Sequence, residues 1–394
     1  MLIGIVGRPS SGKSTFFKAA TLMDVLIADY PFATIKPNHG MGYVKIEDLA
    51  PEFDKISQPR EGYVKGPAGK WRFVPVDLLD VAGLVEGASE GKGLGNEFLS
   101  DLAGADAFIH VVDMSGESDT EGKPAKDFYP GEDIKVIENE LDLWYLGILK
   151  KVWKTFARQV EMEKTNFAEA VADQFSGLKV TDEDVKAVVL KSKLNSEKPA
   201  QWTEDDLKTF AQALRKESKK MIIAANKMDM PNSKKNLAKV KKEFDYEVIG
   251  CFSEGELALR EADKAGLIEY IPGEKTFRVV GELSKKQTDA LNEVEKYMKE
   301  HKGTGIQDVM NEIVFGVMKQ VCVFPAGDKL TDSKGNVLPD CYLMPQGSTA
   351  LDFAYRLHSD IGDGFIKAID VRTKKAVGKE YEIKHRDGLE IVTK

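Results

Sequence analysis

The 394-residue chain is too long for one hydrophobic core, so we expect two or three domains. Its composition, 42% hydrophobic and 30% charged, is that of an ordinary soluble globular protein. A net charge of −8 argues against a general nucleic-acid coat, although one domain could still carry a basic face. The three cysteines have no metal-ligand or redox spacing, and no run approaches the ~18 apolar residues that span a bilayer. We therefore expect a cytoplasmic protein with no membrane segment and no disulfide framework.

The first expected strand, residues 2–6, leads into the full phosphate-loop pattern Gly-x-x-x-x-Gly-Lys-Ser at residues 7–14. Glycines let the backbone point several N–H groups at phosphates, and the N-terminus of the following helix adds its positive end. Lys13 is expected to reach the β- and γ-phosphates, and the Ser14 hydroxyl to bind Mg²⁺. The predicted nucleotide contacts here are Gly7, Arg8, Pro9, Ser10, Ser11, Gly12, Lys13, Ser14 and Thr15.

Thr34 lies between the phosphate loop and the next expected strand, residues 43–46. Its hydroxyl could complete the magnesium shell only when the γ-phosphate is present, so this loop is predicted to sense the nucleotide state. An ordinary polar loop residue is the alternative interpretation.

Asp80 and Gly83 stand at the end of the expected strand 73–81 and just after it. Asp80 is predicted to hold the magnesium shell, and the Gly83 N–H to contact the γ-phosphate. The four glycines of residues 87–95 cannot hold a stable helix, so we expect a segment that changes partners with the nucleotide. The predicted catalytic residues are Lys13, Thr34 and Gly83, and the predicted metal ligands are Ser14, Thr34 and Asp80.

After the expected strand 107–112 the pattern becomes helical. Apolar residues recur at a spacing of three and four from Ile134 to Phe156, and no proline occurs from residue 135 to 198. Thr203 is expected to cap a further helix. Residues 134–220 are therefore predicted to form an inserted helical domain, a hairpin with a coiled-coil-like seam. Helices that cover the main domain are the alternative.

Asn226-Lys227-Met228-Asp229 follows the expected strand 221–225. The Asp229 carboxylate can accept hydrogen bonds from both N1–H and the 2-amino group of guanine. Adenine has an acceptor at N1 and no 2-amino group, so such a site discriminates by roughly 10⁴-fold or more. Asn226 is predicted to contact the N7 side of the base and to tie loops together, with the Lys227 stem over the ring. The pattern favours GTP over ATP.

The rest of the chain adds a strand at 247–251 and helices at 255–265 and 284–300, after which its character changes. Residues 1–133 and 221–318 are predicted to form one doubly wound α/β domain, and residues 319–394 a small α+β module. The module's expected elements are strands at 321–324, 341–344, 365–371 and 390–392 and a helix at 349–357. Either a basic face or a solvated edge is indicated by Lys367, Arg372, Lys374, Lys375 and Lys379.

With these residues in place, the chain resembles the Obg-related translation-factor GTPases, specifically the YchF-like subfamily in its archaeal form. The resemblance runs nearly end to end and is most specific at residues 30–38 and 80–95. It implies a P-loop GTPase domain, a helical insertion and a C-terminal TGS module, which has a ubiquitin-like β-grasp fold. It also implies Mg²⁺, bound GTP or GDP, and a ribosome or RNA partner that the TGS and helical domains contact. We expect a monomer.

Four features of the sequence modify what the resemblance implies. Leu84 stands where Ras-like GTPases place the water-orienting Gln, so intrinsic turnover is expected to be low. Many YchF relatives carry Glu at the position of Asp229 and accept ATP, whereas Asp229 favours GTP. Obg relatives often have Asn at the position of Ser10, a residue linked to potassium-stimulated hydrolysis, so we do not expect that stimulation. The family's loop that contacts the guanine oxygen falls on Phe252, Ser253 and Glu254, where a backbone N–H could serve.

The sequence thus predicts a switch that hydrolyses GTP to GDP and phosphate. Two alternatives stay open. One is a YchF-like protein that hydrolyses ATP. The other is a non-catalytic RNA- or ribosome-binding adaptor in which the nucleotide is structural.

Overall fold

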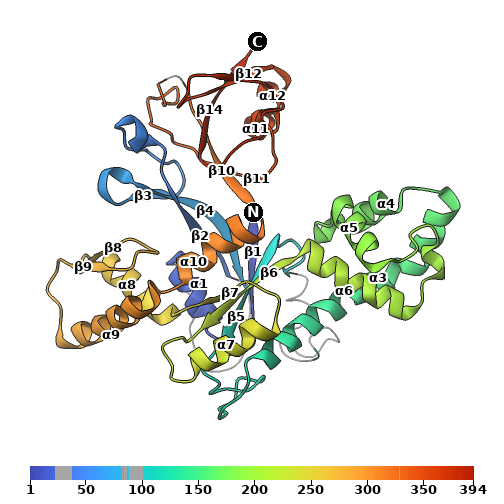
Figure 1. Ribbon diagram of the computed structural model, residues 1–394, viewed down its shortest axis with the longest axis horizontal. Coiled ribbons are helices and arrows are strands. Elements are labelled where there is room, and N and C mark those ends of the chain that lie inside the picture. Colours follow the sequence, from blue (N-terminus) through green and yellow to red (C-terminus); the bar gives the residue numbers. More distant parts are fainter. Residues whose placement is uncertain (23–37, 82, 84–86, 88–100, 328) are drawn as a thin grey trace.

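The computed structural model describes residues 1–22, 38–81, 83, 87, 101–327 and 329–394. The predictions made for Thr34, Leu84 and residues 88–95 lie outside these ranges. The described chain has a main α/β part, a helical insertion and a C-terminal module, and the last two project from the main part in different directions (Figure 1). No helix of the described residues is long and apolar enough to cross a membrane.

The main part is built on a seven-stranded sheet of the described residues, with the order β2-β4-β1-β5-β6-β7 and with β3 paired to β4. Neighbours from β4 to β7 run parallel, which brings the carboxyl ends of these strands to one edge. The strand bounds are β1 (Leu2–Val6), β2 (Asn38–Glu47), β3 (Tyr63–Lys65), β4 (Trp71–Asp80), β5 (Ala107–Asp113), β6 (Lys220–Asn226) and β7 (Val248–Gly250).

Strand β2 runs antiparallel to β4 and is longer than the predicted residues 43–46. Its second half alternates between buried and less buried residues, as on an edge strand with one covered face. Its first half, which begins Asn38-His39-Gly40, is polar and glycine-rich. Periodicity alone therefore identified only the apolar half of the strand.

Helices cover both faces of the sheet. On one face, α3 (Gly131–Glu163) and α7 (Ser233–Glu243) pack on strand residues such as Val6 and Val112. On the other, α1 (Lys13–Thr21) and α10 (Ile306–Asn311) pack on residues such as Ile5. Further elements of this part are α8 (Ser253–Lys264), α9 (Lys285–His301), β8 (Ile268–Tyr270), β9 (Phe277–Val279) and short helices at Ala50–Phe53, Pro67–Gly69 and Glu312–Val317.

The insertion holds α3, α4 (Phe167–Gln174), α5 (Asp182–Ser192) and α6 (Glu204–Ser218), so the expected hairpin is too simple. Thr203 caps α6 as predicted, and Asn166 and Thr181 cap α4 and α5 through their side-chain oxygens. Short helices at Ser176–Leu178 and Pro199–Gln201 complete it. The four helices enclose an aromatic core in which Trp153 and Trp202 stack, with ring centroids 5.1 Å apart.

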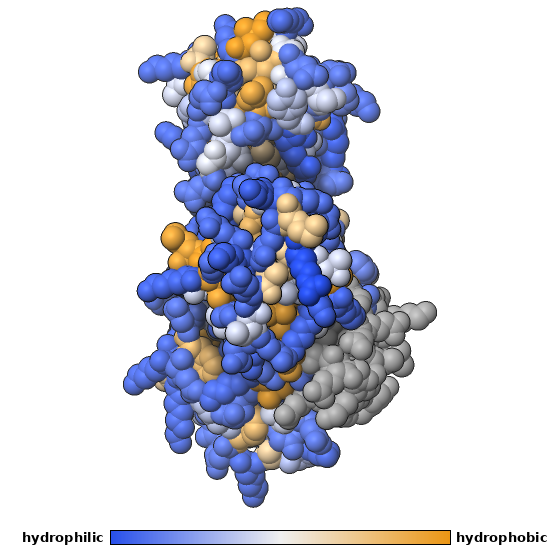
Figure 2. Space-filling model, turned by 90° about the vertical axis from the view of Figure 1, so that its right-hand side faces the viewer, coloured by the Kyte–Doolittle hydropathy of each residue, from blue (hydrophilic) through white to orange (hydrophobic). Residues whose placement is uncertain are grey.

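In the C-terminal module the described residues form a five-stranded sheet with the order β11-β10-β14-β12-β13, against which α11 packs. Its bounds are β10 (Gln320–Pro325), β11 (Tyr342–Pro345), α11 (Ala350–Leu357), α12 (Ser359–Asp363), β12 (Phe365–Asp370), β13 (Ala376–Val377) and β14 (Asp387–Thr393). These elements agree with the predicted small α+β module. Figure 2 shows one face of the molecule as mostly hydrophilic, with separate apolar spots.

Arginines join the module to the main part. Arg372 Nε donates to Glu52 Oε2 at 2.6 Å, and Arg386 Nη2 donates to the same carboxylate at 2.6 Å. Buried Arg72 of β4 donates to the main-chain oxygens of Leu338 and Pro339 at 3.0 and 2.9 Å. Arg372 therefore forms part of the junction. The sequence interpretation that placed it on a free basic face is wrong for this residue.

Candidate nucleotide site

The phosphate loop connects β1 to the first turn of α1, where the sequence pattern requires it. Gly7 and Gly12 have φ values of 149° and 91°, which side chains rarely adopt. A Cβ at Gly12 would also lie 2.3 Å from Asn226 Nδ2, and one at Gly7 would lie 2.5 Å from the main-chain oxygen of Val111. The loop therefore packs so tightly on the ends of β5 and β6 that only glycine fits at these two positions.

Lys13, Ser14 and Asp80 meet at the start of α1. Lys13 Nζ donates to the main-chain oxygen of Arg8 at 2.8 Å, and Ser14 Oγ donates to Asp80 Oδ2 at 2.9 Å. Burial lowers the pKa of Lys13 to about 8, an effect that Asp80 opposes. Burial also raises the pKa of Asp80, an effect that Lys13 opposes.

These residues fit a magnesium ion. Asp80 Oδ1 is buried and has no hydrogen-bond partner among the described residues, and it lies on the carboxylate that holds the Ser14 hydroxyl. Oxygen ligands of this kind are those that Mg²⁺ prefers. Gly83 also lies against the phosphate loop, because a Cβ there would be 2.6 Å from the nitrogen of Pro9. The structure thus brings Lys13, Ser14, Asp80 and Gly83 together, while Thr34 lies outside the described residues.

Asn226, at the end of β6, ties three segments together. Its Nδ2 donates to the main-chain oxygen of Ser11 at 3.0 Å, and its Oδ1 accepts from the N–H and the Oγ of Ser253 at 3.2 and 2.8 Å. The Phe252 ring packs on Tyr297 at 5.0 Å, and Glu254 is exposed. Of the three residues predicted for this loop, Ser253 is therefore the one whose side chain supports Asn226.

Lys227 and Asp229 follow Asn226 in the same loop. Lys227 Nζ donates to Asp113 Oδ2, at the end of β5, at 2.9 Å. Asp229 is exposed. Desolvation nevertheless raises the pKa of Asp229. Asp229 is thus accessible to a base that enters the site.

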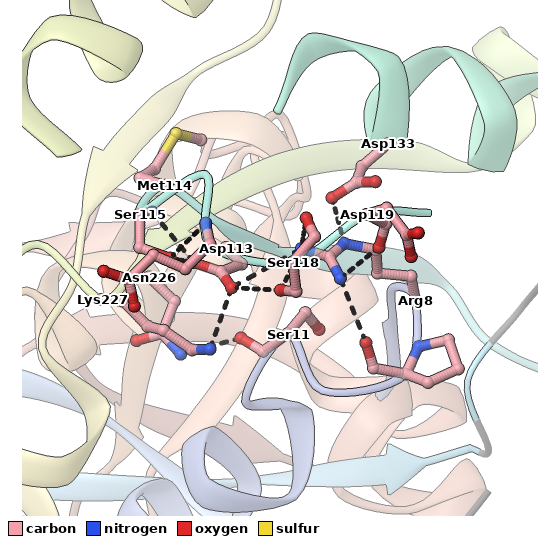
Figure 3. A network of polar contacts seen from close by, with 12 residues as sticks. Arg8, Ser11, Asp113, Met114, Ser115, Ser118, Asp119, Asp133, Asn226 and Lys227 are labelled. Carbon is pink, nitrogen blue, oxygen red and sulfur yellow. Dashed lines mark hydrogen bonds and ion pairs between the residues drawn. The ribbon is translucent and has the colours of Figure 1, made fainter. Parts of the chain in front are cut away.

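Arg8 lies in the phosphate loop, and its side chain enters a polar network with Ser118 and Asp133 (Figure 3). Its Nη2 donates to the main-chain oxygen and the Oγ of Ser118 at 3.1 and 2.9 Å, and its Nη1 donates to the main-chain oxygen of Asp119 at 2.6 Å. Its Nε forms an ion pair with Asp133 in the first turn of α3. Arg8 can thus offer a nucleotide its main chain but not its guanidinium.

Three matches to family models cover most of the chain. Residues 2–142 match the model described as a 50S ribosome-binding GTPase, residues 224–328 the G4 motif-containing domain of YGR210-like Obg-like GTPases, and residues 321–393 the TGS domain. An uncharacterized GTP-binding protein from Methanocaldococcus jannaschii is 44% identical over 100% of this chain and 99% of its own. The chain belongs to the YchF-like group of Obg-related GTPases.

Two further relatives extend this result. The crystal structure of a GTP binding protein from Pyrococcus horikoshii OT3 superposes with a TM-score of 0.81 at 36% identity, with 100% of each chain covered. The ribosome-binding ATPase YchF of Bacillus subtilis is 29% identical over 93% of this chain and 87% of its own. The fold of this YchF-like GTPase is thus a P-loop GTPase domain with a helical region and a C-terminal TGS domain. Some of these relatives are named GTP-binding proteins and others are named ATPases.

The sequence-based prediction missed several site residues of this YchF-like GTPase. Asp113 accepts from Lys227 and from the Oγ atoms of Ser115 and Ser118, and Asp133 pairs with Arg8. One signal was available, since Asp113 ends a buried strand as Asp80 does. Asp133 carried no such signal, because its partner lies 125 residues away in the sequence.

Proposed function

We propose that the protein binds GTP with Mg²⁺, hydrolyses it slowly, and uses the two states as a switch in association with the ribosome. The observation that carries this proposal is the bridge formed by Asn226. The side-chain amide of Asn226 is hydrogen-bonded to Ser11 in the phosphate loop and to Ser253 after β7. A base bound beside Asp229 and a phosphate bound beside Lys13 would then lie at a fixed separation.

Each residue of the site has a proposed role. The backbone of Gly7 to Thr15 and the Lys13 ammonium would hold the phosphates, and Ser14 and Asp80 would hold the metal, with Thr34 completing its shell. Bound Mg²⁺ would neutralise charge on the β- and γ-phosphates. Gly83 would direct its N–H at the γ-phosphate. Leu84 supplies no group that could orient water, so turnover by the isolated protein should be slow.

The proposed domain limits follow the same division. Residues 1–133 and 221–318 would form the GTPase domain, residues 134–220 the helical insertion and residues 319–394 the TGS domain. The protein would act as a monomer in the cytoplasm, and its insertion and TGS domain would provide the ribosome or RNA contacts. Support for a ribosomal partner comes from the name of the Bacillus subtilis relative and from the description of the matched GTPase model.

Binding of labelled GTP and GDP, with Mg²⁺ present, tests the phosphate site. Loss of one charge-assisted contact in Lys13→Ala should weaken GTP binding about 10- to 100-fold. The matched control is Lys154→Ala, which removes an exposed lysine of α3 and should bind like the parent chain. Equal affinity of the parent chain and Lys13→Ala, with both folded, would contradict the proposal.

Selection of guanine is tested by Asp229→Asn. The asparagine Oδ1 can still accept from N1–H, but its NH2 group would face the guanine 2-amino group, donor against donor, and would suit the 2-carbonyl group of xanthine. GTP affinity should fall by roughly 10²–10⁴-fold while XTP affinity rises. ATP that competes equally with GTP for the parent chain would favour the second candidate, an ATPase, which the name of the Bacillus subtilis relative suggests.

The switch is tested by sedimentation with ribosomes in GDP and in a non-hydrolysable GTP analogue, and by single-turnover hydrolysis with and without ribosomes. We expect stronger association in one nucleotide state and faster hydrolysis on the ribosome. Association that ignores the nucleotide would instead support the adaptor interpretation. Fast turnover without a partner would contradict the slow intrinsic rate.

A further inference from the structure

Arg8 is a buried cation of the phosphate loop whose guanidinium is held by protein groups. Its side chain is 2% exposed, and its three nitrogens contact Ser118, Asp119 and Asp133. Its Nη2 also lies 3.5 Å from Asp113 Oδ2. The backbone at Arg8 would hold phosphates with almost any side chain, so these contacts serve another purpose than charge on the ligand.

The partners of Arg8 come from three places in the fold. Asp113 ends β5, Ser118 and Asp119 lie in the loop after β5, and Asp133 lies in the first turn of α3. The Asp113 carboxylate also accepts from Lys227 in the loop after β6. Figure 3 shows Asp113 between Lys227 and Arg8, with Asp133 on the far side of Arg8. A continuous set of polar contacts, buried except at Lys227, therefore joins the loop after β6, the phosphate loop and α3.

Burial makes this arrangement depend on its geometry. The side chains of Asp113 and Asp133 are 0% and 1% exposed, so neither charge can be compensated by water. A buried ion pair is weak evidence for stability, but removal of one partner is strongly destabilising, which fixes the relative positions of the groups. The planar guanidinium adds direction, since its N–H groups point along fixed lines.

From these contacts we infer that Arg8 is a positioning residue, which sets the backbone of the phosphate loop by fixing it to the first turn of α3 and, through Asp113, to the loop after β6. This inference rests on the proposed nucleotide site. Helix α3 makes a second polar contact with a segment after β4, because Glu140 Oε1 accepts from the N–H of Gly87 at 2.7 Å. Nucleotide binding and the position of α3 are then linked, and the linkage works in both directions.

Nucleotide affinity of the full-length chain tests the inference. Arg8→Ala should weaken GDP and GTP binding at least about 10-fold. Arg8→Lys should weaken it about 3- to 10-fold, because lysine keeps the positive charge but lacks the several directed N–H groups of the guanidinium. Asp133→Asn should weaken nucleotide binding about as much as Arg8→Lys. The double variant Arg8→Ala/Asp133→Asn should bind nucleotide little more weakly than Arg8→Ala alone. The matched control is Arg278→Ala, which removes an exposed arginine paired with Glu269 at 2.6 Å and should bind like the parent chain.

A second measurement separates positioning from simple loss of stability. In the parent chain, nucleotide should slow hydrogen exchange of the amides of residues 131–141, and this effect should be reduced in Arg8→Lys and Asp133→Asn. If Arg8→Ala does not fold, the affinity and hydrogen exchange of Arg8→Lys and Asp133→Asn test the inference. Folded variants that lose only thermal stability, while affinity and nucleotide-dependent exchange match the parent chain, would overturn the inference. No binding by the parent chain itself would instead overturn the proposed function.

Discussion

The nucleotide end of the main sheet and the junction with the TGS domain are both held by arginines, but the two sets differ in burial. At the nucleotide end, Arg8 is 2% exposed and contacts Asp113 and Asp133. At the junction, the Arg372 side chain is 29% exposed and its partner Glu52 is 36% exposed. The arginine–carboxylate pairs thus lie in a buried region of low dielectric constant at the nucleotide end and in a partly solvated region at the junction.

This difference predicts different mechanical behaviour. A buried charge that loses its partner costs about 3–5 kcal/mol, whereas an exposed ion pair contributes about 0–1 kcal/mol and is screened by salt. The arginine contacts at the nucleotide end should therefore keep one geometry more strictly than the exposed arginine contacts at the junction. Arg72 is the exception at the junction, since it is buried and reaches two main-chain oxygens.

The largest effect is expected for Asp113→Ala. This change removes the buried acceptor of Lys227, Ser115 and Ser118 and leaves the Arg8 charge with one carboxylate fewer. The free energy of unfolding in urea should fall by about 3–5 kcal/mol. Asp113→Asn keeps acceptor oxygen at the same place and should lose less. Equal losses of unfolding free energy in the two variants would show that the charge of Asp113, and not its acceptor oxygens, stabilises the site. No loss in either variant would contradict the difference between buried and exposed contacts.

A smaller effect is expected for Arg72→Met, which fills the same space without donors. The main-chain oxygens of Leu338 and Pro339 would lose their partner, at a cost of about 1–3 kcal/mol. Hydrogen exchange of residues 337–345 should accelerate before that of the main sheet. The control Arg60→Met removes exposed contacts to Asp332 and Asp340 and should change this exchange less. Identical exchange in the two variants would argue against a buried anchor.

The Arg8 pair should also show a pH dependence. Burial raises the pKa of Asp133 to about 7, an effect that Arg8 opposes. The carboxylate then loses its charge as the pH falls through 7, and Arg8 loses its ionised partner. The ratio of nucleotide affinities, parent chain over Asp133→Asn, should therefore rise from pH 6 to pH 8. Nucleotide titration affects both chains alike, so a flat ratio would show that Asp133 does not change charge in this range.

The smallest effect is expected for Arg372→Ala. One exposed pair with Glu52 is lost, while Arg386 still reaches the same carboxylate. Unfolding free energy should change by about 0–1 kcal/mol, and less in about 1 M salt than in about 0.1 M. A loss as large as that of Arg72→Met, or one independent of salt, would mean that burial does not separate the two regions.

Features coded by neighbouring residues were predictable from the sequence. The phosphate-loop pattern at residues 7–14, the strands that carry Asp80 and Asn226, and the Thr203 cap each depend on a short segment. The same kind of signal marked Asn166 and Thr181, whose caps begin α4 and α5, but the apolar spacing up to Phe156 and the absence of proline from residue 135 to 198 suggested a simpler hairpin.

Features that depend on distant pairs were not predictable in this way. The side-chain direction of Arg8 is decided by Ser118, Asp119 and Asp133, which lie more than a hundred residues later. Arg372 joins Glu52 across 320 residues, so its sequence neighbours Lys374 and Lys375 suggested a basic surface instead. Such pairings are set by topology, which periodicity does not reveal.

Helix α3 gives the insertion a long reach. It has 33 residues and is therefore roughly 50 Å long, with Asp133 close to one end. Over that length, a tilt of about 5° at the phosphate loop moves the far end by about 4 Å. A displacement too small to alter the sheet would thus become a movement of atomic dimensions at a distant surface.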